Sequence, residues 1–262
     1  MAGPNIRFDD GAAYERMMGI WSRMAGAVFL DWLKPAPDQR WIDIGCGNGA
    51  FTELLVDHCR PTEVIGIDPS EGQLVFARAR LSARPAEFRQ GDLMALSFPD
   101  ARFDAAVMAL VIFYARDSAK GIGEMIRVVR PGGIVATYIW DMLGGGSPTE
   151  PIHAEMRAMG VTPPSPPSLA ASRLDVLLEL WNGAGLCGID TREIIVERSF
   201  SDFEDFWNTT LLQPSVGPAV ASMPSNDAEK LKERVRARLT PSVSGSITYA
   251  ARANAIKGLR PG

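Results

Sequence analysis

The feature that most constrains this chain is the stretch from Arg40 to Leu54, RWIDIGCGNGAFTEL. A short apolar run interrupted by one carboxylate, Asp43, leads into a turn that contains Gly45, Gly47 and Gly49. Helix-spaced apolar residues follow, so the order predicts a buried parallel strand, a tight turn and a helix start. Glycine serves where a ligand touches bare backbone, and the free amides of a helix N-terminus favour a carboxylate or phosphate.

The spacing of these glycines separates the possible sites. Dinucleotide-binding loops have the pattern Gly-x-Gly-x-x-Gly, whereas this loop is Gly-x-Gly-x-Gly, with Ala50 where the wider pattern needs glycine. Cys46, inside the turn, is a small side chain that fits there. An ordinary strand–helix turn of an α/β protein stays open as the plainer interpretation.

Two more carboxylates follow predicted strands. A second strand over Glu63–Ile67 ends at Asp68, where a carboxylate can accept hydrogen bonds from both hydroxyls of a ribose. Ser70-Glu71-Gly72-Gln73 has the form of a capping box that starts the next helix. A third strand over Ala86–Gln90 continues into Gly91-Asp92-Leu93. A helix cap for Asp68 and a turn for Asp92 are the plainer interpretations.

The next segment repeats the strand–helix order. Phe98-Pro99-Asp100 and Phe103-Asp104 lead to a fourth strand over Ala105–Ala109. A helix over Ile122–Val129, a tight turn at Arg130-Pro131-Gly132-Gly133 and a fifth strand over Ile134–Trp140 come after it.

Together these motifs closely resemble those of class I S-adenosylmethionine-dependent methyltransferases, in particular the small-molecule branch of the ubiquinone/menaquinone-biosynthesis type. The resemblance covers roughly Trp41 to Trp140. Alternating strands and helices predict an α/β, doubly wound parallel sheet. The resemblance adds a Rossmann-like sheet of seven strands in the order 3-2-1-4-5-7-6, the seventh antiparallel, with helical lid insertions. It implies S-adenosyl-L-methionine as cofactor and S-adenosyl-L-homocysteine as product.

The resemblance also implies site residues. An amphipathic pattern predicts a helix over Ala13–Leu33, which either packs on the core edge or closes over the ligand. Asp92 matches the aspartate that meets the adenine amino group in the family. We expect cofactor contacts from Tyr14, Trp21, Arg23, Asp43, Gly45, Cys46, Gly47, Gly49, Asp68, Pro69, Gln73, Gly91, Asp92, Leu93, Ala109 and Leu110.

After the fourth strand, the loop Leu110–Asp117 carries Ile112 and Phe113 where many relatives have histidine or polar residues. This difference weakens any proposal of a base on that loop and suggests an apolar wall. It also lacks the Asn/Asp-Pro-Pro-aromatic motif of DNA amino-methyltransferases. A base is needed only if the acceptor arrives protonated, and the candidates elsewhere are His153, Asp141 and Tyr138.

The remaining chain predicts lid segments around the last strands. Residues 141–171 are rich in glycine and proline around a short helix near Ile152–Met159, and a helix over Ser172–Gly185 and a strand over Arg192–Ser199 follow. Ser201-Asp-Phe-Glu204 has the form of a second capping box. A charged helix at 226–239 precedes a closing strand at Ser246–Ala255. We expect a single domain with a capping helix (1–37), a cofactor core (38–140), lid insertions (141–171 and 200–240) and a closing strand (241–262).

Composition limits the kinds of molecule that this protein is expected to bind. The chain has 262 residues, 46% of them hydrophobic and 22% charged, and a net charge of −4, which argues against a large nucleic-acid footprint. Its longest apolar stretch is too short to span a bilayer. Three cysteines without metal-type spacing and only two histidines predict reduced thiols, a cytoplasmic location and no metal site. A monomer or a homodimer fits equally.

The predicted reaction is in-line displacement of a methyl group onto an oxygen, nitrogen or carbon acceptor. The lid segments hold an apolar, adaptable set that suits a small, largely apolar or aromatic molecule: Trp140, Met142, Met156, Met159, Phe203, Phe206, Trp207 and Met223. These residues could instead only bury the lid. Two other functions stay open: a non-catalytic protein that binds the cofactor and regulates, and a nicotinamide-dependent oxidoreductase.

Overall fold

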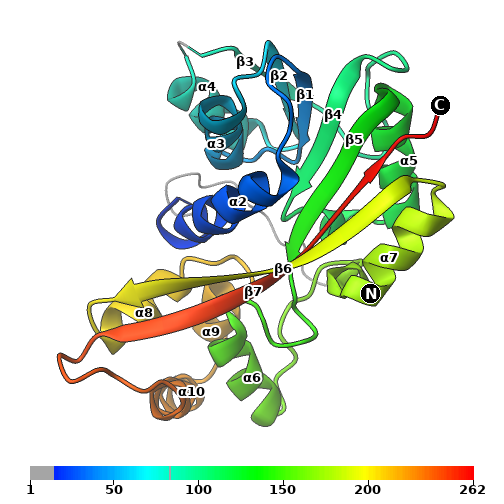
Figure 1. Cartoon of the computed structure of the whole chain (residues 1–262). Helices are drawn as coiled ribbons and strands as arrows, with labels where there is room; N and C mark the ends of the chain where they lie inside the picture. The colour runs from blue at the N-terminus through cyan, green and yellow to red at the C-terminus, as the bar shows by residue number, and fades with distance from the viewer. Residues whose placement is uncertain (1–14, 83) are drawn as a thin grey trace.

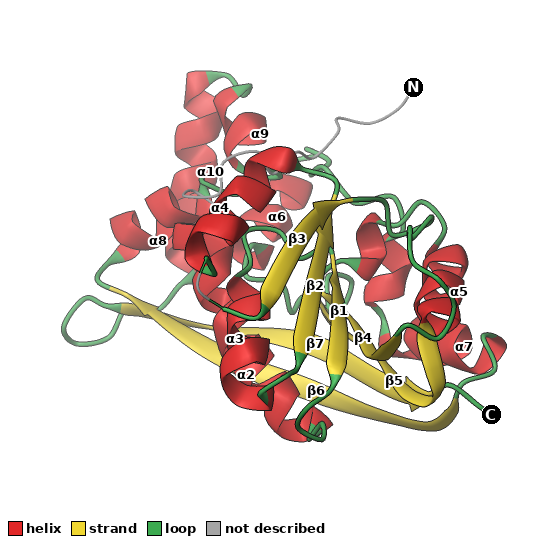
Figure 2. Ribbon diagram, turned by 90° about the horizontal axis from the view of Figure 1, so that it is seen from above, coloured by secondary structure: helices red, strands yellow, loops and turns green. Residues whose placement is uncertain are grey.

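The computed structural model describes residues 15–82 and 84–262. In these ranges the chain folds around a seven-stranded sheet with helices on both faces (Figures 1 and 2). The first residues of the helix predicted from Ala13 and the cofactor candidate Tyr14 lie outside the described residues.

The sheet confirms the predicted strand order. Its strands follow the order β3-β2-β1-β4-β5-β7-β6, and β7 alone runs antiparallel to its neighbours. The winding reverses between β1 and β4, and the edge beyond such a reversal is where open α/β sheets bind ligands. The strands are β1 (Arg40–Ile44), β2 (Glu63–Asp68), β3 (Ala86–Gln90), β4 (Phe103–Ala109), β5 (Val129–Trp140), β6 (Cys187–Phe200) and β7 (Ile247–Leu259).

Helices cover both faces of the sheet. Figure 2 shows α2 (Ile20–Leu33), α3 (Ala50–Cys59) and α4 (Glu71–Arg80) on one face, and α5 (Ser118–Val128) and α7 (Leu174–Gly183) on the other. The central strands are therefore buried on both sides, which explains their apolar runs: Trp41, Ile42 and Val107 are fully buried.

A second group of helices lies beside the long ends of β6 and β7 (Figure 1): α6 (Glu150–Ala158), α8 (Phe203–Thr210), α9 (Gly217–Ala221) and α10 (Ser225–Arg238). Glu155 of α6 accepts hydrogen bonds from Arg234 Nε at 2.7 Å and Arg238 Nε at 3.0 Å, both on α10. The two predicted lid segments thus pack on each other through an ion-paired contact.

Several strand boundaries differ from the prediction, and the largest differences arise because long-range pairing extends three strands. β6 begins at Cys187 rather than Arg192, and β7 continues to Leu259 rather than ending at Ala255, because the two pair along most of their length. β5 begins at Val129, so the predicted Pro-Gly-Gly turn lies inside a strand. There the register with β4 shifts between Phe103 and Ala105.

Helix starts differ where an acidic cap was not recognised. α5 begins at Ser118 rather than Ile122, because Asp117 accepts the Lys120 amide at 2.9 Å. The second capping box was wrong by one residue. Asp202, not Ser201, is the N-cap of α8, and its carboxylate accepts the Asp205 amide at 2.8 Å.

Other helices begin with irregular turns. A π-helical turn, η1 (Glu15–Gly19), precedes α2, and a 3-10 turn, η3 (Leu169–Ser172), precedes α7, which begins at Leu174 rather than Ser172. One half of the first capping box is confirmed, because Ser70 Oγ accepts the Gln73 amide at 3.4 Å. The other half is not formed, because the Ser70 amide donates to Asp68 Oδ1 rather than to Gln73.

Candidate functional site

The glycine turn joins β1 to α3 and uses a left-handed backbone at all three glycines, with φ of 75° at Gly45, 54° at Gly47 and 78° at Gly49. Their surroundings differ. A Cβ on Gly45 would lie 2.4 Å from Val111 Cγ2, and one on Gly49 3.1 Å from Ala77 Cβ, so both glycines allow close packing. A Cβ on Gly47 would meet nothing within 4 Å. Gly47 is therefore the glycine whose bare backbone faces open space.

Asp68, at the end of β2, lies against this turn. Its Oδ2 accepts the Gly47 amide at 2.9 Å, and its Oδ1 accepts the Ser70 amide at 2.8 Å. Burial raises the pKa of the Asp68 carboxyl, and the two amide bonds oppose that rise. The structure thus brings together the predicted turn and the predicted carboxylate across the strand ends.

Asp43, within β1, is fully buried behind the turn. Thr52 Oγ1 donates to its Oδ2 at 2.7 Å, but its Oδ1 has no hydrogen-bond partner among the described residues. Burial raises the pKa of Asp43 to about 7, with Thr52 lowering it and the charge of Asp68 adding to the rise. A buried carboxylate oxygen without a donor is costly, so this position favours a cationic or hydrogen-bonding ligand group.

A small cavity of about 10 Å³ lies beside Asp43. Its walls come from α2, β1, the turn, α3 and the end of β4: Ser22, Asp43, Gly45, Cys46, Asn48, Ala50, Phe51 and Ala109. Burial, followed by the charges of Asp43 and Asp68, holds the pKa of the Cys46 thiol well above its usual value. Cys46 is therefore a neutral, small wall residue.

A second cavity of about 50 Å³ lies past the ends of β2 and β3. It is lined by Ile67, Arg89, Gln90, Gly91, Asp92, Ala95, Leu96, Ser97 and Phe98. Gly91 leaves this space open, since a Cβ there would lie 2.8 Å from Ile67 Cγ2. Asp92 is exposed at the rim, and its Oδ1 accepts the Met94 amide at 2.9 Å. Both residues of the predicted Gly-Asp pair thus line the same cavity.

Three predicted residues near these cavities contribute differently. The Leu93 side chain packs toward α5, where a Cβ on Gly121 would lie 2.5 Å from Leu93 Cδ1. The Pro69 carbonyl accepts Gln90 Nε2 at 2.9 Å, which joins the ends of β2 and β3. Gln73 is buried in the first turn of α4.

The N-terminal helix closes one side of the edge. Trp21 is 1% exposed and makes edge-to-face contacts with Trp140 (centroids 6.2 Å apart) and Tyr249 (6.4 Å). Arg23 is engaged in ion pairs with Glu15 and, at 3.9 Å, with Glu53. The structure therefore places Trp21 in an aromatic cluster and Arg23 in a charged network.

That network contains site residues that the sequence analysis missed. Glu15 Oε2 accepts Arg80 Nη2 at 2.5 Å and Asn48 Nδ2, from the glycine turn, at 3.0 Å. Burial would raise the pKa of Glu15, but hydrogen bonds and charges from Arg80 and Arg23 lower it overall. Arg198 of β6 donates to the carbonyls of Met17 (2.9 Å) and Arg16 (3.0 Å). Asn48 could have been suspected from its place within the turn, whereas Glu15 and Arg198 carry no local signal.

The end of β4 forms the other side of the edge. Ala109 lines the cavity beside Asp43. Leu110 has a left-handed φ of 64°, held by its amide's 2.8 Å hydrogen bond to the Tyr138 carbonyl. A non-glycine residue in this region is strained and often marks a functional turn. Ile112 and Phe113 follow in a short 3-10 turn, both buried, in keeping with an apolar wall.

The three candidate bases lie in different environments. Tyr138 is fully buried, and its hydroxyl donates to the Ser22 carbonyl at 3.2 Å. Asp141 pairs with Arg252 Nη2 at 2.7 Å. His153 is 3% exposed, with Nδ1 3.3 Å from Thr149 Oγ1. Burial, then the charge of Arg157, lowers the pKa of His153 to about 4, so the ring is neutral at pH 7.

The predicted lid residues divide into two groups. Phe203 and Trp207 stack on each other, with Arg236 4.3 Å from the Phe203 centroid and Lys232 5.9 Å from the Trp207 centroid, so they pack toward α10. Phe206 also contacts Phe203, with centroids 6.4 Å apart, but it reaches Tyr249 as well, at 6.3 Å, and Tyr249 contacts Trp21, which contacts Trp140. Met156 is fully buried, whereas Met142, Met159 and Met223 are partly buried against the core.

This geometry defines a class of protein. The sheet is doubly wound with an antiparallel β7, and it carries a glycine turn after β1 and carboxylates after β2 and β3. Open α/β sheets with these features bind nucleotide cofactors at this edge. Among the described residues, no group of three or more His, Cys, Asp or Glu could hold a metal ion. In the same part of the chain, no helix is both long and apolar enough to cross a bilayer.

Comparisons with known proteins agree with this class. A family described as "Methyltransferase domain" matches residues 42–137. A probable S-adenosylmethionine-dependent methyltransferase of Mycolicibacterium smegmatis is 31% identical over 203 residues, which cover 73% of this chain and 76% of that protein. A solved structure from Bacillus halodurans shares the fold, with a TM-score of 0.59, 16% identity, and 90% and 99% of the two chains covered.

The chain belongs to the S-adenosylmethionine-dependent methyltransferases, a family of enzymes whose cofactor is S-adenosylmethionine. A demethylmenaquinone methyltransferase of Bacteroides fragilis is 36% identical over 117 residues. That match covers 43% of this chain and 46% of the relative, so it spans about half the length of the relative.

Proposed function

We propose that this chain transfers a methyl group from S-adenosylmethionine to a small, largely apolar or aromatic metabolite. The observation that carries the proposal is the Gly47 backbone, which faces open space while its amide is held by the Asp68 carboxylate. The open backbone of Gly47 would let a ligand approach closely, and the neighbouring Asp68 carboxylate could accept hydrogen bonds from the hydroxyls of a ribose.

Each half of the edge suits one half of the cofactor. Gly45, Cys46, Gly47 and Gly49 would present backbone to the methionine portion, and the partnerless Asp43 Oδ1 would receive its ammonium group. Asp68 would accept the ribose hydroxyls. Gly91, Asp92 and the Leu93 amide would meet the adenine, and the remaining expected contacts, Tyr14, Trp21, Arg23, Pro69, Gln73, Ala109 and Leu110, would flank it.

The two cavities measure about 50 and 10 Å³, well below the roughly 300 Å³ of a small-molecule site. Binding would therefore widen this edge. The N-terminal turn, which Glu15 and Arg198 join to the rest through side-chain contacts and which also buries Met17 and Met18, borders this edge.

The chemistry needs alignment more than proton transfer. S-adenosylmethionine supplies an activated methyl group on a sulfonium, whose thioether leaving group requires no acid. The chain's contribution is to align the acceptor and to exclude water, for which Trp21 and Trp140 provide buried aromatic walls. If the acceptor arrives protonated, neutral His153 is the candidate base, since Asp141 is ion-paired and Tyr138 is bonded to Ser22.

We propose that the N-terminal helix and the segments 141–171 and 200–240 recognise the acceptor. The support is the aromatic contact path that runs from Trp21 and Trp140 through Tyr249 to Phe206. Phe203 and Trp207 are assigned to the contact with α10 instead. An apolar path of this kind suits a flat, apolar acceptor.

Two measurements test the function. Calorimetry with S-adenosylhomocysteine should show binding, and NADH under the same conditions should show none; the reverse result would favour an oxidoreductase. A methyl-donor consumption screen on a metabolite panel should then identify an acceptor. Tight binding of S-adenosylhomocysteine with no turnover on any compound would instead support a regulatory protein.

A further inference from the structure

The wall of the 50 Å³ cavity has little secondary structure of its own. Ala95, Leu96, Ser97 and Phe98 line the cavity and lie between β3 and β4. Local support comes from an isolated bridge between Asp92 and Ala95 and from the Phe98 amide on the Leu96 carbonyl at 2.8 Å. A segment with so few ladder bonds depends on side chains for a fixed position.

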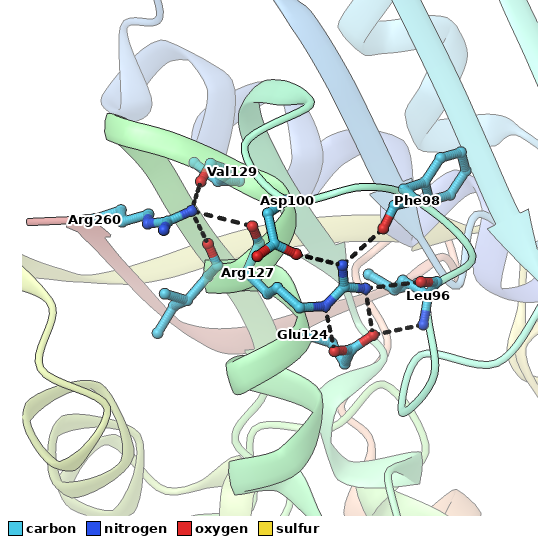
Figure 3. Close-up of polar contacts among 8 residues, drawn as sticks. Leu96, Phe98, Asp100, Glu124, Arg127, Val129 and Arg260 are labelled. Carbon is cyan, nitrogen blue, oxygen red and sulfur yellow. Dashed lines mark hydrogen bonds and ion pairs between the residues drawn. The ribbon is translucent and has the colours of Figure 1, made fainter.

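Arg127, in the last turn of α5, supplies that support (Figure 3). Its Nη2 donates to the Leu96 carbonyl at 2.8 Å, and its Nη1 donates to the Phe98 carbonyl at 2.7 Å. Nη1 also reaches Asp100 Oδ1 at 3.0 Å. One guanidinium thus binds two carbonyls of the cavity wall from behind.

Glu124 completes this contact and orients the guanidinium. Arg127 donates to Glu124 Oε1 through Nε at 2.7 Å and to Oε2 through Nη2 at 2.8 Å. Glu124 Oε2 also accepts the Leu96 amide at 2.7 Å. The pair therefore holds both the N–H and the C=O of Leu96, and only a planar fork with several donors can make all of these bonds at once.

The end of α5 that carries Arg127 is itself anchored. Arg260 Nη1, from the residue after β7, donates to the carbonyls of Ile126 (3.1 Å), Arg127 (3.0 Å) and Val129 (2.5 Å) (Figure 3). A cation on the last carbonyls of a helix stabilises that end. The backbone that carries Arg127 is thereby fixed to the sheet.

We infer that Arg127, with Glu124, is a positioning residue of the cofactor site: it holds Leu96–Phe98 as the wall against which the adenine ring binds. The inference rests on the proposed function, because it takes this cavity as the adenine end of the site. Arg127 is absent from the residues that line the cavity, so it acts through the wall.

The test compares the affinity of the full chain and its variants for S-adenosylhomocysteine by calorimetry. Arg127→Ala should raise Kd about tenfold, the factor expected if the wall occupies its binding position in about one molecule in ten. Arg127→Lys keeps the charge but not the fork, and it should lose nearly as much. The affinity for adenosine alone should fall by a similar factor. Hydrogen exchange of the Leu96 amide should become faster in both variants.

Arg102→Ala is the matched control. Arg102 Nη2 also holds a carboxylate, Glu63, at 2.7 and 2.5 Å, but at the start of β2, at the opposite end of that strand from the cavity. The Arg102→Ala variant should leave the Kd for S-adenosylhomocysteine unchanged. If Arg127→Ala does not fold, Glu124→Gln keeps the side-chain volume and should raise Kd in the same direction.

The outcomes separate the two claims. Unchanged affinity in folded Arg127→Ala, full rescue by Arg127→Lys, or an equal loss in Arg102→Ala would each overturn the role of Arg127. If the unaltered chain binds no S-adenosylhomocysteine, the proposed function fails instead.

Discussion

The amide of Gly47 donates a 2.9 Å hydrogen bond to Asp68 Oδ2, which ties the turn after β1 to the end of β2. The other oxygen of the same carboxylate accepts the Ser70 amide, the start of α4. Asp68 therefore has two effects that mutation can separate: it shapes the turn, and it offers a charged acceptor at the edge of the sheet.

Replacing Asp68 by Ala should weaken cofactor binding by on the order of 1–3 kcal/mol, because a charge-assisted acceptor is lost. Calorimetry with S-adenosylhomocysteine measures this change. Asp68→Asn retains one acceptor oxygen for Gly47 and should lose less. Unchanged affinity in a folded Asp68→Ala variant would remove this residue from the site.

Replacing Gly47 by Val should abolish cofactor binding, because the branched side chain would occupy the open space in front of the turn. Backbone strain at positive φ should cost about 1–2 kcal/mol of folding stability. Gly185→Val is the matched control, since Gly185 has a φ of 75° and open space around its Cβ but follows α7. Equal effects of the two variants on binding would mean that Gly47 does not approach a ligand.

The Asp43 carboxyl, with a pKa raised to about 7, should make stability and binding depend on pH in opposite directions. This folded pKa lies above the ordinary carboxyl pKa of 3.8, so the native state binds an extra proton at pH values between the two. The free energy of unfolding should therefore rise as pH falls from about 7 toward 4. Cofactor affinity should rise with pH through 7, because an ammonium group favours the charged carboxylate.

Asp43→Asn removes this titration. Denaturant unfolding and calorimetry over the same pH range, compared with the unaltered chain, should lose the slope that Asp43 contributes. Identical pH profiles for the two proteins would show that the Asp43 carboxyl does not titrate in this pH range.

The N-cap of α8 can be tested by stability alone. Asp202→Ala should lower the free energy of unfolding by about 1 kcal/mol, because the Asp205 amide loses its partner. Ser201→Ala should change it less, since the exposed Ser201 hydroxyl makes only a 3.4 Å contact with Asp205. A larger loss for Ser201→Ala in chemical denaturation would contradict the assignment of Asp202.

The KM for the acceptor should depend on Phe206 rather than on Phe203. Phe206→Leu should raise the KM for the identified acceptor several-fold without changing the Kd of S-adenosylhomocysteine, because Phe206 contacts Tyr249 of the aromatic path. Phe203→Leu, which loosens the contact with α10, is the control for lid packing. If both leave turnover unchanged, the proposed acceptor surface is wrong.

The sequence by itself determined the parts of this protein that depend on local rules. Alternating strand and helix patterns predicted the sheet, and the resemblance carried by the glycine turn and its neighbours supplied the strand order that the structure shows. Ser70 was recognised as a cap because capping depends on residues only a few positions apart. Glycine at positive φ and a carboxylate at a strand end are visible from sequence for the same reason.

The tertiary structure decided which side chains from distant parts of the chain contact each other. It paired Glu15 with Arg80, Asp141 with Arg252, and Arg127 with the carbonyls of Leu96 and Phe98. It also lengthened β6 and β7 and turned Phe203 and Trp207 toward α10. A charged or aromatic side chain has many possible partners along a chain, and only the folded arrangement of the helices and strands selects one of them.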